Sequence, residues 1–209
     1  QMCIRDSNSS KLFRLTTGQQ IRDMVRFHNT GPQQQLGLIA MSVQDAEGYV
    51  DPFHQSIVTL INANQSAASI AIPEFQQQAL SLHPVLETAN DPRVQEANFD
   101  PMQAQFLVPA RSAIVFVQTR DAIQQVDLLL TLIDEFSGEG SIKPGLARAK
   151  SALLRVARRH LERGRNELAQ VLIRITLRGL DVEQRLGLIN ADAATNLATR
   201  LEHILSSIQ

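Results

Sequence analysis

The spacing of apolar residues along the chain changes twice, and each change marks a different kind of structure. Near the N-terminus, Ile21, Met24 and Val25 fall on one face of a short helix. Over residues 36–118 the apolar positions come instead in short or alternating runs, and beyond Thr119 they recur at helical spacing. The pattern therefore predicts one short helix, then a β-sheet region, then a helical region.

The short helix carries its own start and stop signals. Thr17 and Gln20 form the T-x-x-Q pattern of a capping box, in which each side chain satisfies the other residue's backbone N–H. Asn29, Gly31 and Pro32 disfavour any continuation of the helix. Because a helix of about ten residues is not stable alone in water, we expect it to pack against another part of the protein.

The sheet region consists of short apolar segments separated by turn residues. Gly, Pro, Asn and Asp bound the segments, as in YVDPF, NANQS and ANDP. Short strands at this spacing favour an antiparallel β-sandwich. The predicted strands are residues 36–43, 55–62, 67–72, 79–86, 104–108 and 112–118.

The helical region predicts a small bundle with short connections. Its helices are expected at residues 122–136, 146–164, 166–180 and 191–208, with a short helix within 181–189. On the second helix the predicted buried stripe is Leu146, Ala149, Leu153, Val156 and Ala157, and on the third it is Leu168, Val171, Leu172 and Ile175. The predicted fold class is thus β plus α: an antiparallel β-sandwich followed by a small all-α bundle, with the boundary near residues 118–121.

Composition and charge narrow the classes of function. The 209 residues carry a formal net charge of −1, which gives no general attraction to nucleic acid or to an anionic surface. The single cysteine, Cys3, excludes an intrachain disulfide and a cysteine-based metal site. No apolar run approaches the roughly 18 residues of a membrane-spanning helix. Residues 1–8 show no periodicity and no initial Met, so we interpret them as an artefact preceding a piece of a longer protein.

Loop carboxylates are the first candidates for chemistry. Glycoside hydrolysis needs two carboxylates at a set separation, and five acids lie in predicted loops: Asp45, Glu47, Asp51, Asp91 and Asp100. Turns also recruit Asp for its hydrogen bonds to the backbone, which is the interpretation we favour.

The remaining side chains give no sign of a metal or cofactor site. The five histidines are not clustered at ligand spacing, and no Gly-rich loop joins a strand to a helix as in nucleotide sites. The histidines are His28, His54, His83, His160 and His203. The sequence therefore predicts no catalytic residue, no metal site and no cofactor in this chain.

The second predicted helix of the bundle has a basic face. At 100° per residue, Arg148, Arg155, Arg159 and Arg163 share one arc opposite the leucines. Such a stripe could bind a polyanion, a cell-wall polymer or acidic headgroups. The alternative is an ordinary solvated helix surface, and a nucleic-acid interface is disfavoured because the domain is not basic throughout.

Aromatic residues do not indicate a carbohydrate-binding platform. The chain has no Trp and one Tyr, Tyr49, which shares a loop with Phe53. These two could form a small contact patch, although packing is the favoured role. Phe106, Phe116 and Phe136 lie on predicted strands and a helix stripe, where we expect core packing.

Several separated motifs of the chain resemble those of one enzyme family. SSKLFRL (9–15) followed by a short helix and VRFHNTGP (25–32) resembles the junction between the catalytic barrel and the C-terminal β-sandwich of pullulanase-type α-1,6-glucosidases. Lys11 departs from the pattern, because the family commonly has Pro there. The resemblance covers residues 9–118 and continues through SIVTLINAN (56–64), LHPVLETANDPRVQEANFD (82–100) and FLVPARSAIVFV (106–117).

The resemblance implies a non-catalytic tail of a starch-debranching enzyme. In the family, the Asp nucleophile and the Glu acid/base lie in the barrel, so this chain alone is expected to be inactive. Residues 9–28 would be the stub of the barrel's end, 29–119 the sandwich and 120–209 the bundle. The residues expected to dock on the upstream catalytic barrel are Leu12, Phe13, Leu15, Ile21, Met24 and Val25. The implied substrate is an α-glucan: pullulan, glycogen or amylopectin.

Residues 124–208 resemble the FIMAH type of helical module found at the C-termini of bacterial extracellular proteins. VDLLLTLIDEF, ALLRVARRHLERG and LINADAATNL carry this resemblance. It implies an extracellular or cell-surface location. Two other hypotheses remain: a non-enzymatic attachment module that binds cell-wall polymer or a membrane surface through the arginines, and a bundle that dimerises the enzyme.

Overall fold

The computed structural model of the chain describes residues 10–208. The whole segment interpreted as an artefact, residues 1–8, therefore lies outside the described residues. The chain divides into two compact units between Thr119 and Arg120, and each is described by itself below.

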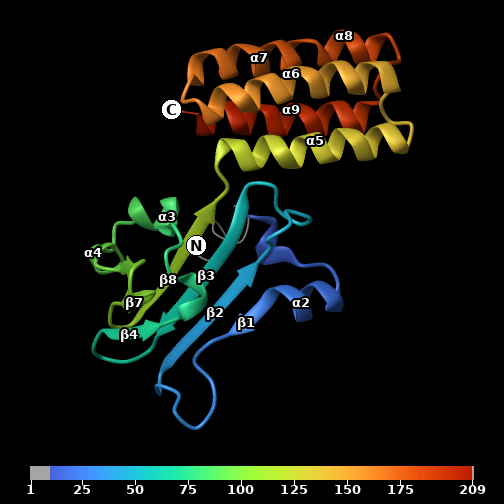
Figure 1. The fold of residues 1–209 in the computed structure, drawn as a ribbon. Helices are drawn as coiled ribbons and strands as arrows, with labels where there is room; N and C mark the ends of the chain where they lie inside the picture. The colour runs from blue at the N-terminus through green and yellow to red at the C-terminus, as the bar shows by residue number, and fades with distance from the viewer. Residues whose placement is uncertain (1–9, 209) are drawn as a thin grey trace. The chain divides into compact units, whose positions relative to one another are not determined.

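The first unit is built from two antiparallel sheets, which confirms the predicted sandwich. Figure 1 shows β1, β2, β3 and β8 running beside one another. The five-stranded sheet has the order β1-β2-β3-β8-β5, formed by Val25–Phe27, Leu38–Gln44, His54–Asn62, Ser112–Thr119 and Ser81–Leu82. The three-stranded sheet has the order β4-β7-β6, formed by Ala68–Ala71, Gln105–Val108 and Asn98–Asp100.

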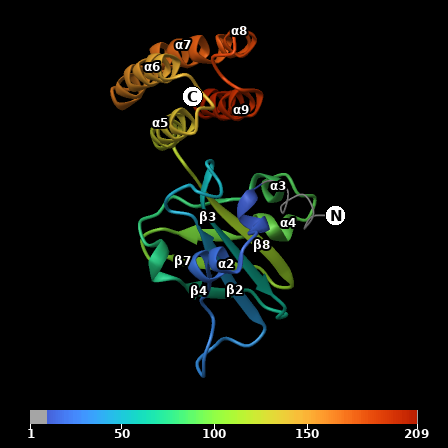
Figure 2. The ribbon, with the colours of Figure 1, turned by 90° about the vertical axis from the view of Figure 1, so that its right-hand side faces the viewer.

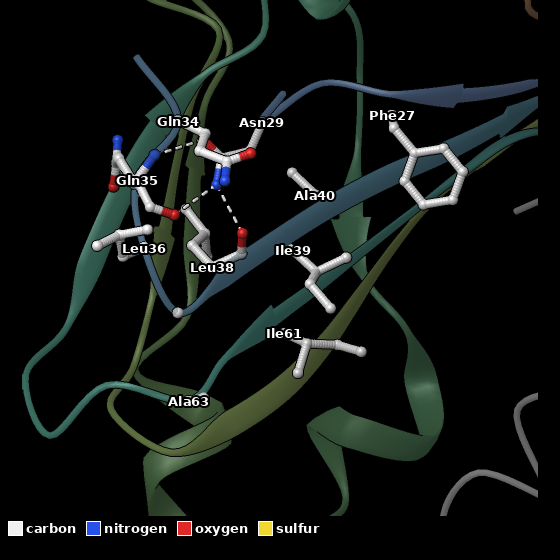
Figure 3. A pocket seen from close by; sticks show the side chains of 11 residues that line it. Phe27, Asn29, Gln34, Gln35, Leu36, Leu38, Ile39, Ala40, Ile61 and Ala63 are labelled. Atoms are coloured by element: carbon white, nitrogen blue, oxygen red, sulfur yellow. Dashed lines mark hydrogen bonds between the residues drawn. The ribbon is translucent and has the colours of Figure 1, made fainter. Parts of the chain in front are cut away.

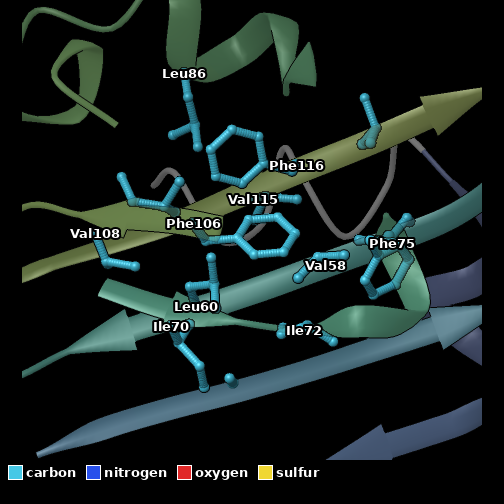
Figure 4. Packing of buried hydrophobic residues seen from close by; sticks show 14 of the residues in the cluster. Val58, Leu60, Ile70, Ile72, Phe75, Leu86, Phe106, Val108, Val115 and Phe116 are labelled. Carbon is cyan, nitrogen blue, oxygen red and sulfur yellow. The ribbon is translucent and has the colours of Figure 1, made fainter. Parts of the chain in front are cut away.

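The core of the first unit lies between the two sheets. Residues directly opposite each other on neighbouring strands point to the same side of a sheet. Val58 of β3 and its partner Phe116 of β8 therefore share one side of the larger sheet. Phe106 of the smaller sheet meets Phe116 with ring centroids 5.3 Å apart, in an edge-on arrangement. Figure 4 shows these rings among the aliphatic side chains of Leu60 and Val108. Phe106 and Phe116 thus have the core positions predicted for them.

The N-terminal segment packs on the same unit. It forms a 3-10 helix, η1 (Lys11–Arg14), and then α2 (Gly18–Met24), whose capping box between Thr17 and Gln20 is present as predicted. The helix ends earlier than expected because Val25 already belongs to β1, where it pairs with Val43. An edge strand of three residues is too short to leave a recognisable alternation in the sequence.

One predicted strand is wrong over most of its length. Of residues 79–86, only Ser81–Leu82 form a strand, β5. Pro84 then occupies the first turn of α3 (Pro84–Glu87), and the ring of His83 accepts a hydrogen bond from the backbone N–H of Val85. Proline suits a first helical position because it has no N–H to satisfy there. The remaining short elements are η2 (Pro73–Phe75) and α4 (Pro92–Gln95).

The second unit is helical, as predicted. Asp121 and Asn190 cap the first and last helices through their side chains. Both views place α6, α7 and α8 together, with α5 and α9 forming the other side of the unit (Figures 1 and 2). The helices are α5 (Ala122–Gly138), α6 (Pro144–Glu162), α7 (Asn166–Arg178), α8 (Leu180–Arg185) and α9 (Ala191–Ser207).

Two of the predicted apolar stripes are misplaced by about one residue. The buried residues of α6 include Lys150 and Leu154. Of the predicted stripe, Ala157 is buried, Leu153 is only partly buried and Ala149 is exposed. The corresponding face of α7 is made by Ala169, Ile173 and Thr176. Three residues predicted to be buried on α7 are instead about half exposed: Leu168 (50%), Val171 (50%) and Ile175 (51%). In the part of the chain that the structure describes, no helix is both long and apolar enough to cross a membrane.

Candidate functional site

The side of the larger sheet that faces away from the smaller sheet carries exposed apolar side chains. Ile39 of β2 and Ile61 of β3 are cross-strand partners and are 52% and 40% exposed. Phe27 of β1 is 60% exposed, and Leu36, on the loop that precedes β2, is 79% exposed. We call Phe27, Leu36, Ile39 and Ile61 the outer apolar patch. Contiguous exposed apolar area of this kind marks interaction sites in soluble proteins.

The patch lines a shallow depression of about 420 Å³. Figure 3 shows Phe27, Ile39 and Ile61 along the strands and Leu36 on the connecting loop. The lining is mostly aliphatic and aromatic, and the polar groups at its rim are amides, including Asn29 and Gln34. Because no charged side chain lines the depression, it suits an apolar protein surface rather than an ionic ligand.

Asn29 fixes the loop that shapes one end of the depression. Its side-chain Nδ2 donates hydrogen bonds to the carbonyl oxygens of Gln35 (2.8 Å) and Leu38 (2.6 Å), and its Oδ1 accepts from the backbone N–H of Gln35 (2.8 Å). Gly37 is required in this loop because its φ is +75° and an added Cβ would lie 2.4 Å from Oδ1 of Asn64. The HNTGP segment therefore has a structural role that sequence reasoning did not assign.

His28, the first residue of that segment, joins β1 to the core. Its Nε2 lies 2.8 Å from Oγ of Ser42, and its ring meets Phe75 edge-on at 6.1 Å between centroids. Partial burial lowers the pKa of His28 below its usual value of 6.5; Glu74 opposes this and Arg26 adds to it. The imidazole is thus held in its neutral form.

Acidification is therefore expected to weaken the first unit through His28. A group whose pKa is lowered by folding contributes stability that is complete above the unfolded-state pKa and is lost as the pH falls through the folded-state pKa. The free energy of unfolding should accordingly fall between neutral pH and about pH 5. Chemical denaturation at both pH values measures this. A His28→Gln variant should lose less stability on acidification, and an unchanged pH dependence in that variant would contradict the assignment.

The opposite end of the outer side is covered by the N-terminal segment. Leu12 of η1 is 1% exposed and belongs to the core of the first unit, where η1 contacts β2 and β3. Ser10 donates a hydrogen bond from its hydroxyl to Asp51, and the backbone N–H of Lys11 donates to the same carboxylate at 3.0 Å. The depression is therefore the part of this side that the N-terminal segment leaves uncovered.

The six residues predicted to dock on a barrel are not equally available. Leu12 is fully buried in the sandwich and has no surface left for another domain. The side chain of Ile21 is 50% exposed on α2, which has no fully buried residue of its own. The four remaining side chains are partly buried against the sandwich core: Phe13, Leu15, Met24 and Val25. Sequence reasoning missed the outer apolar patch, because strand alternation does not tell which side of a sheet another layer covers.

Three of the five loop acids, Asp45, Asp91 and Asp100, form hydrogen bonds with backbone N–H groups of their own loops. Asp45 accepts hydrogen bonds from the backbone N–H groups of Tyr49, Val50 and Asp51 at 2.8–3.1 Å. Asp91 caps α4, and Asp100 accepts from Met102 N–H at 2.8 Å. Glu47 is exposed.

Among the acids of residues 10–208, Asp51 has the strongly shifted pKa. Burial opposes its ionisation, but hydrogen bonds from His54, Ser10 and the backbone of Phe53 outweigh burial and hold the pKa of Asp51 well below its usual range. The carboxylate is therefore ionised, and it links the N-terminal segment, through Ser10 and Lys11, to its own loop, through Phe53 and His54. A carboxylate in this state is a structural group and a poor general acid.

The histidines are dispersed over both units. His54 contacts Asp51 at 3.1 Å, His83 caps α3, and Nδ1 of His203 lies 2.8 Å from Oε1 of Gln125. His160 lies near the end of α6. Within residues 10–208, no group of three or more His, Cys, Asp or Glu is arranged to hold a metal ion.

The arginine stripe is on the surface of α6. Arg148, Arg155, Arg159 and Arg163 are all exposed, as their helical positions predicted. Arg158, on the neighbouring face, is instead paired with Asp127 of α5 at 2.5 Å and also contacts Glu162. The four exposed arginines therefore remain a candidate surface for anions.

Tyr49 and Phe53, the two aromatic residues of one loop, are only partly packed. Tyr49 is 80% exposed, so the packing role favoured for it is wrong. Phe53 is partly buried, and Phe136 packs against the bundle core. The tight turn around Asp45 turns the Tyr49 ring outward, which the sequence pattern does not reveal.

Comparison with known proteins assigns both units to families. Residues 1–119 match the family described as alpha-1,6-glucosidases, pullulanase-type, C-terminal. Residues 126–206 match the FIMAH domain family. Both matches agree with the resemblances inferred from the sequence motifs, which are thereby confirmed.

Individual relatives agree with the first match. Pullulanase 1, chloroplastic, of Arabidopsis thaliana is 39% identical over 124 residues, and pullulanase of Klebsiella pneumoniae is 36% identical over 86 residues. These alignments cover 56% and 40% of this chain but only 13% and 8% of the relatives. A crystal structure of PulA from Klebsiella oxytoca aligns with 54% of this chain and 11% of its own, at 29% identity and a TM-score of 0.48.

Proposed function

The chain belongs to the C-terminal family of pullulanase-type α-1,6-glucosidases, and from that premise we propose that it is the non-catalytic C-terminal part of such an enzyme. The parent enzyme would hydrolyse α-1,6-glucosidic bonds in pullulan, glycogen or amylopectin. In a retaining mechanism, one carboxylate acts as nucleophile and the other as acid/base. We place both in a catalytic barrel in the same polypeptide, so this chain alone should release no reducing sugar from pullulan.

The role proposed for the sandwich is to stabilise that barrel by docking through the outer apolar patch. The observation that supports this role is the exposure of Ile39, Ile61 and Phe27 on a sheet whose other side already carries the buried core of the unit. Apolar surface contributes about 25 cal/mol for each Å² removed from water. The half-exposed Ile21 of α2 would extend the same seam.

The first test is the reading frame that encodes this chain. The proposal requires a barrel domain with its paired acids in the same frame. A neighbouring sequence of another class, such as a non-enzymatic surface protein, would overturn it. We also propose an extracellular location, which the FIMAH match supports, and fractionation of the producing cells tests this separately.

The second test places polar residues in the patch. In the polypeptide that contains the catalytic barrel, the double substitution Ile39→Gln/Ile61→Gln should lower the melting temperature of the barrel and its soluble yield. Each Ile→Gln substitution should remove about 1 kcal/mol of the stabilisation that burying the isoleucine at the seam provides. Differential scanning calorimetry measures the barrel transition, and pullulan hydrolysis reports its integrity.

Leu107 provides the matched control. It is an aliphatic side chain on β7 of the other sheet, 37% exposed compared with 40% for Ile61. Leu107→Gln should leave the melting temperature of the barrel unchanged. An equal effect of both substitutions, or none from the double variant, would show that the outer apolar patch is not the seam.

A further inference from the structure

The helical unit has an exposed apolar stripe that its own core does not explain. On α7, Leu168, Val171 and Ile175 lie at helical spacing on the side opposite the buried Ala169 and Ile173. On α8, Val182 and Leu186, at the end of the helix, are 56% and 67% exposed. We call the five exposed residues the α7–α8 stripe. Single exposed apolar residues are ordinary, but five on two consecutive helices form a surface.

Charge is strongly segregated within this unit. Residues 143–186, which comprise α6, α7 and α8, hold 11 Lys and Arg against 4 Asp and Glu, a net charge of +7. The remainder, residues 120–142 and 187–209, holds 2 Lys and Arg against 7 Asp and Glu, a net charge of −5. The near-neutral total thus conceals one basic side and one acidic side.

The basic side and the apolar stripe coincide. Figures 1 and 2 show α6, α7 and α8 on the same side of the unit. Arg174 and Arg178 lie on the exposed surface of α7, and Arg185 lies on α8 beside Leu186. Further arginines, including Arg155 and Arg159, are exposed on α6, which packs against α7. The apolar residues of the α7–α8 stripe are therefore bordered by arginines on α6, α7 and α8.

We propose that this face lies on an anionic lipid bilayer. A membrane interface presents negative headgroups above an apolar layer, so it is complementary to both components of the surface. A soluble polyanion would engage the arginines but gain nothing from the α7–α8 stripe. The aliphatic stems of arginines can lie along the apolar boundary while the guanidinium groups remain with the headgroups. The inference is independent of the function proposed for residues 10–119.

Flotation of the full chain with lipid vesicles tests the proposal. The protein should float with vesicles of phosphatidylcholine and phosphatidylglycerol and remain behind with phosphatidylcholine alone. Added salt should weaken binding, since screening reduces the attraction to headgroups. Arg174→Gln/Arg178→Gln should lower the partition coefficient about 25-fold, at about fivefold for each cation near the surface. Val171→Gln/Ile175→Gln should lower it about tenfold through lost apolar contact.

Control variants and alternative outcomes keep the test decisive. Arg22→Gln and Met102→Gln alter an exposed arginine and an exposed apolar residue of the other unit, and both should bind as the unchanged chain does. Circular dichroism verifies that each variant is folded. No flotation at low salt would overturn the proposal. It would also be overturned if Val171→Gln/Ile175→Gln had no effect on flotation, as for a soluble polyanion such as polyphosphate. A dimer in light scattering that Val171→Gln/Ile175→Gln converts to a monomer would overturn it too, because the stripe would then be covered by a second copy of the chain.

Discussion

Replacing Phe106 with alanine is expected to lower the free energy of unfolding of the first unit by about 3–5 kcal/mol, the range for large-to-small substitutions in a packed core. Phe106 is fully buried between the two sheets. Its ring contacts Phe75, Phe99 and Phe116, at centroid distances of 6.0, 4.4 and 5.3 Å. Truncation would remove three aromatic contacts and leave a cavity that neighbouring strands cannot close, because both are fixed by their hydrogen-bonded registers.

Phe27→Ala is the matched control, because it removes the same ring from an exposed position. Phe27 is 60% exposed, and its loss should change stability by less than about 1 kcal/mol. Urea denaturation followed by far-ultraviolet circular dichroism measures both variants. If Phe106→Ala cost no more than Phe27→Ala, the core would not lie between the two sheets as described.

Replacing Glu183 with alanine is expected to destabilise the helical unit by about 3 kcal/mol, because it leaves a buried charge without its partner. Nζ of Lys150 lies 2.6 Å from Oε2 of Glu183 and donates a hydrogen bond to the carbonyl oxygen of Thr176 at 2.9 Å. The Lys150 side chain is 3% exposed and that of Glu183 is 19% exposed. Because the Glu183 side chain is partly exposed to water, the ion pair is partly screened. The expected loss of stability is therefore at the lower end of the range for buried pairs.

A double variant separates the charge from the packing. Lys150→Met/Glu183→Leu removes both charges and should recover most of the stability lost in Glu183→Ala, since an apolar pair of similar volume replaces the ion pair. Asp127→Asn is the surface control. It breaks an exposed ion pair with Arg158 and should have a much smaller effect. Thermal unfolding followed by the circular dichroism of the helices measures all three variants. An equal loss of stability in Glu183→Ala and Asp127→Asn would contradict the buried ion pair.

Local sequence determined the features that depend on residues close together in the chain. The capping box at Thr17 and Gln20 is present because its partners are three residues apart. The long strands β3 and β8 alternate clearly enough to be located within a few residues. The core face of α9 likewise follows from local spacing: Leu197, Leu201 and Ile204 recur at helical intervals and are all buried.

Short strands, and helices that carry apolar residues on two faces, were less predictable from the sequence. The three-residue strand β1 has no periodicity of its own and exists because β2 offers it a partner. On α7, apolar residues lie on two faces, and their spacing does not show which face meets the core; of the predicted stripe, only Leu172 packs against it. Ala169 and Thr176 are small enough for α6 and α7 to approach closely, which leaves Leu168, Val171 and Ile175 outside.

The sequence by itself determined the order of a β-sandwich and a helical bundle, the family resemblance of each, the capping box at Thr17 and Gln20, and the positions of most strands. Tertiary structure alone decided which apolar surfaces remain uncovered: Leu12 is buried, whereas Ile39, Ile61 and the α7–α8 stripe are exposed. The physical reason is sequence distance. Hydrophobic periodicity records that a residue prefers burial, but whether another layer covers it depends on contacts such as Ser10 with Asp51, 41 residues apart, and Lys150 with Thr176, 26 residues apart.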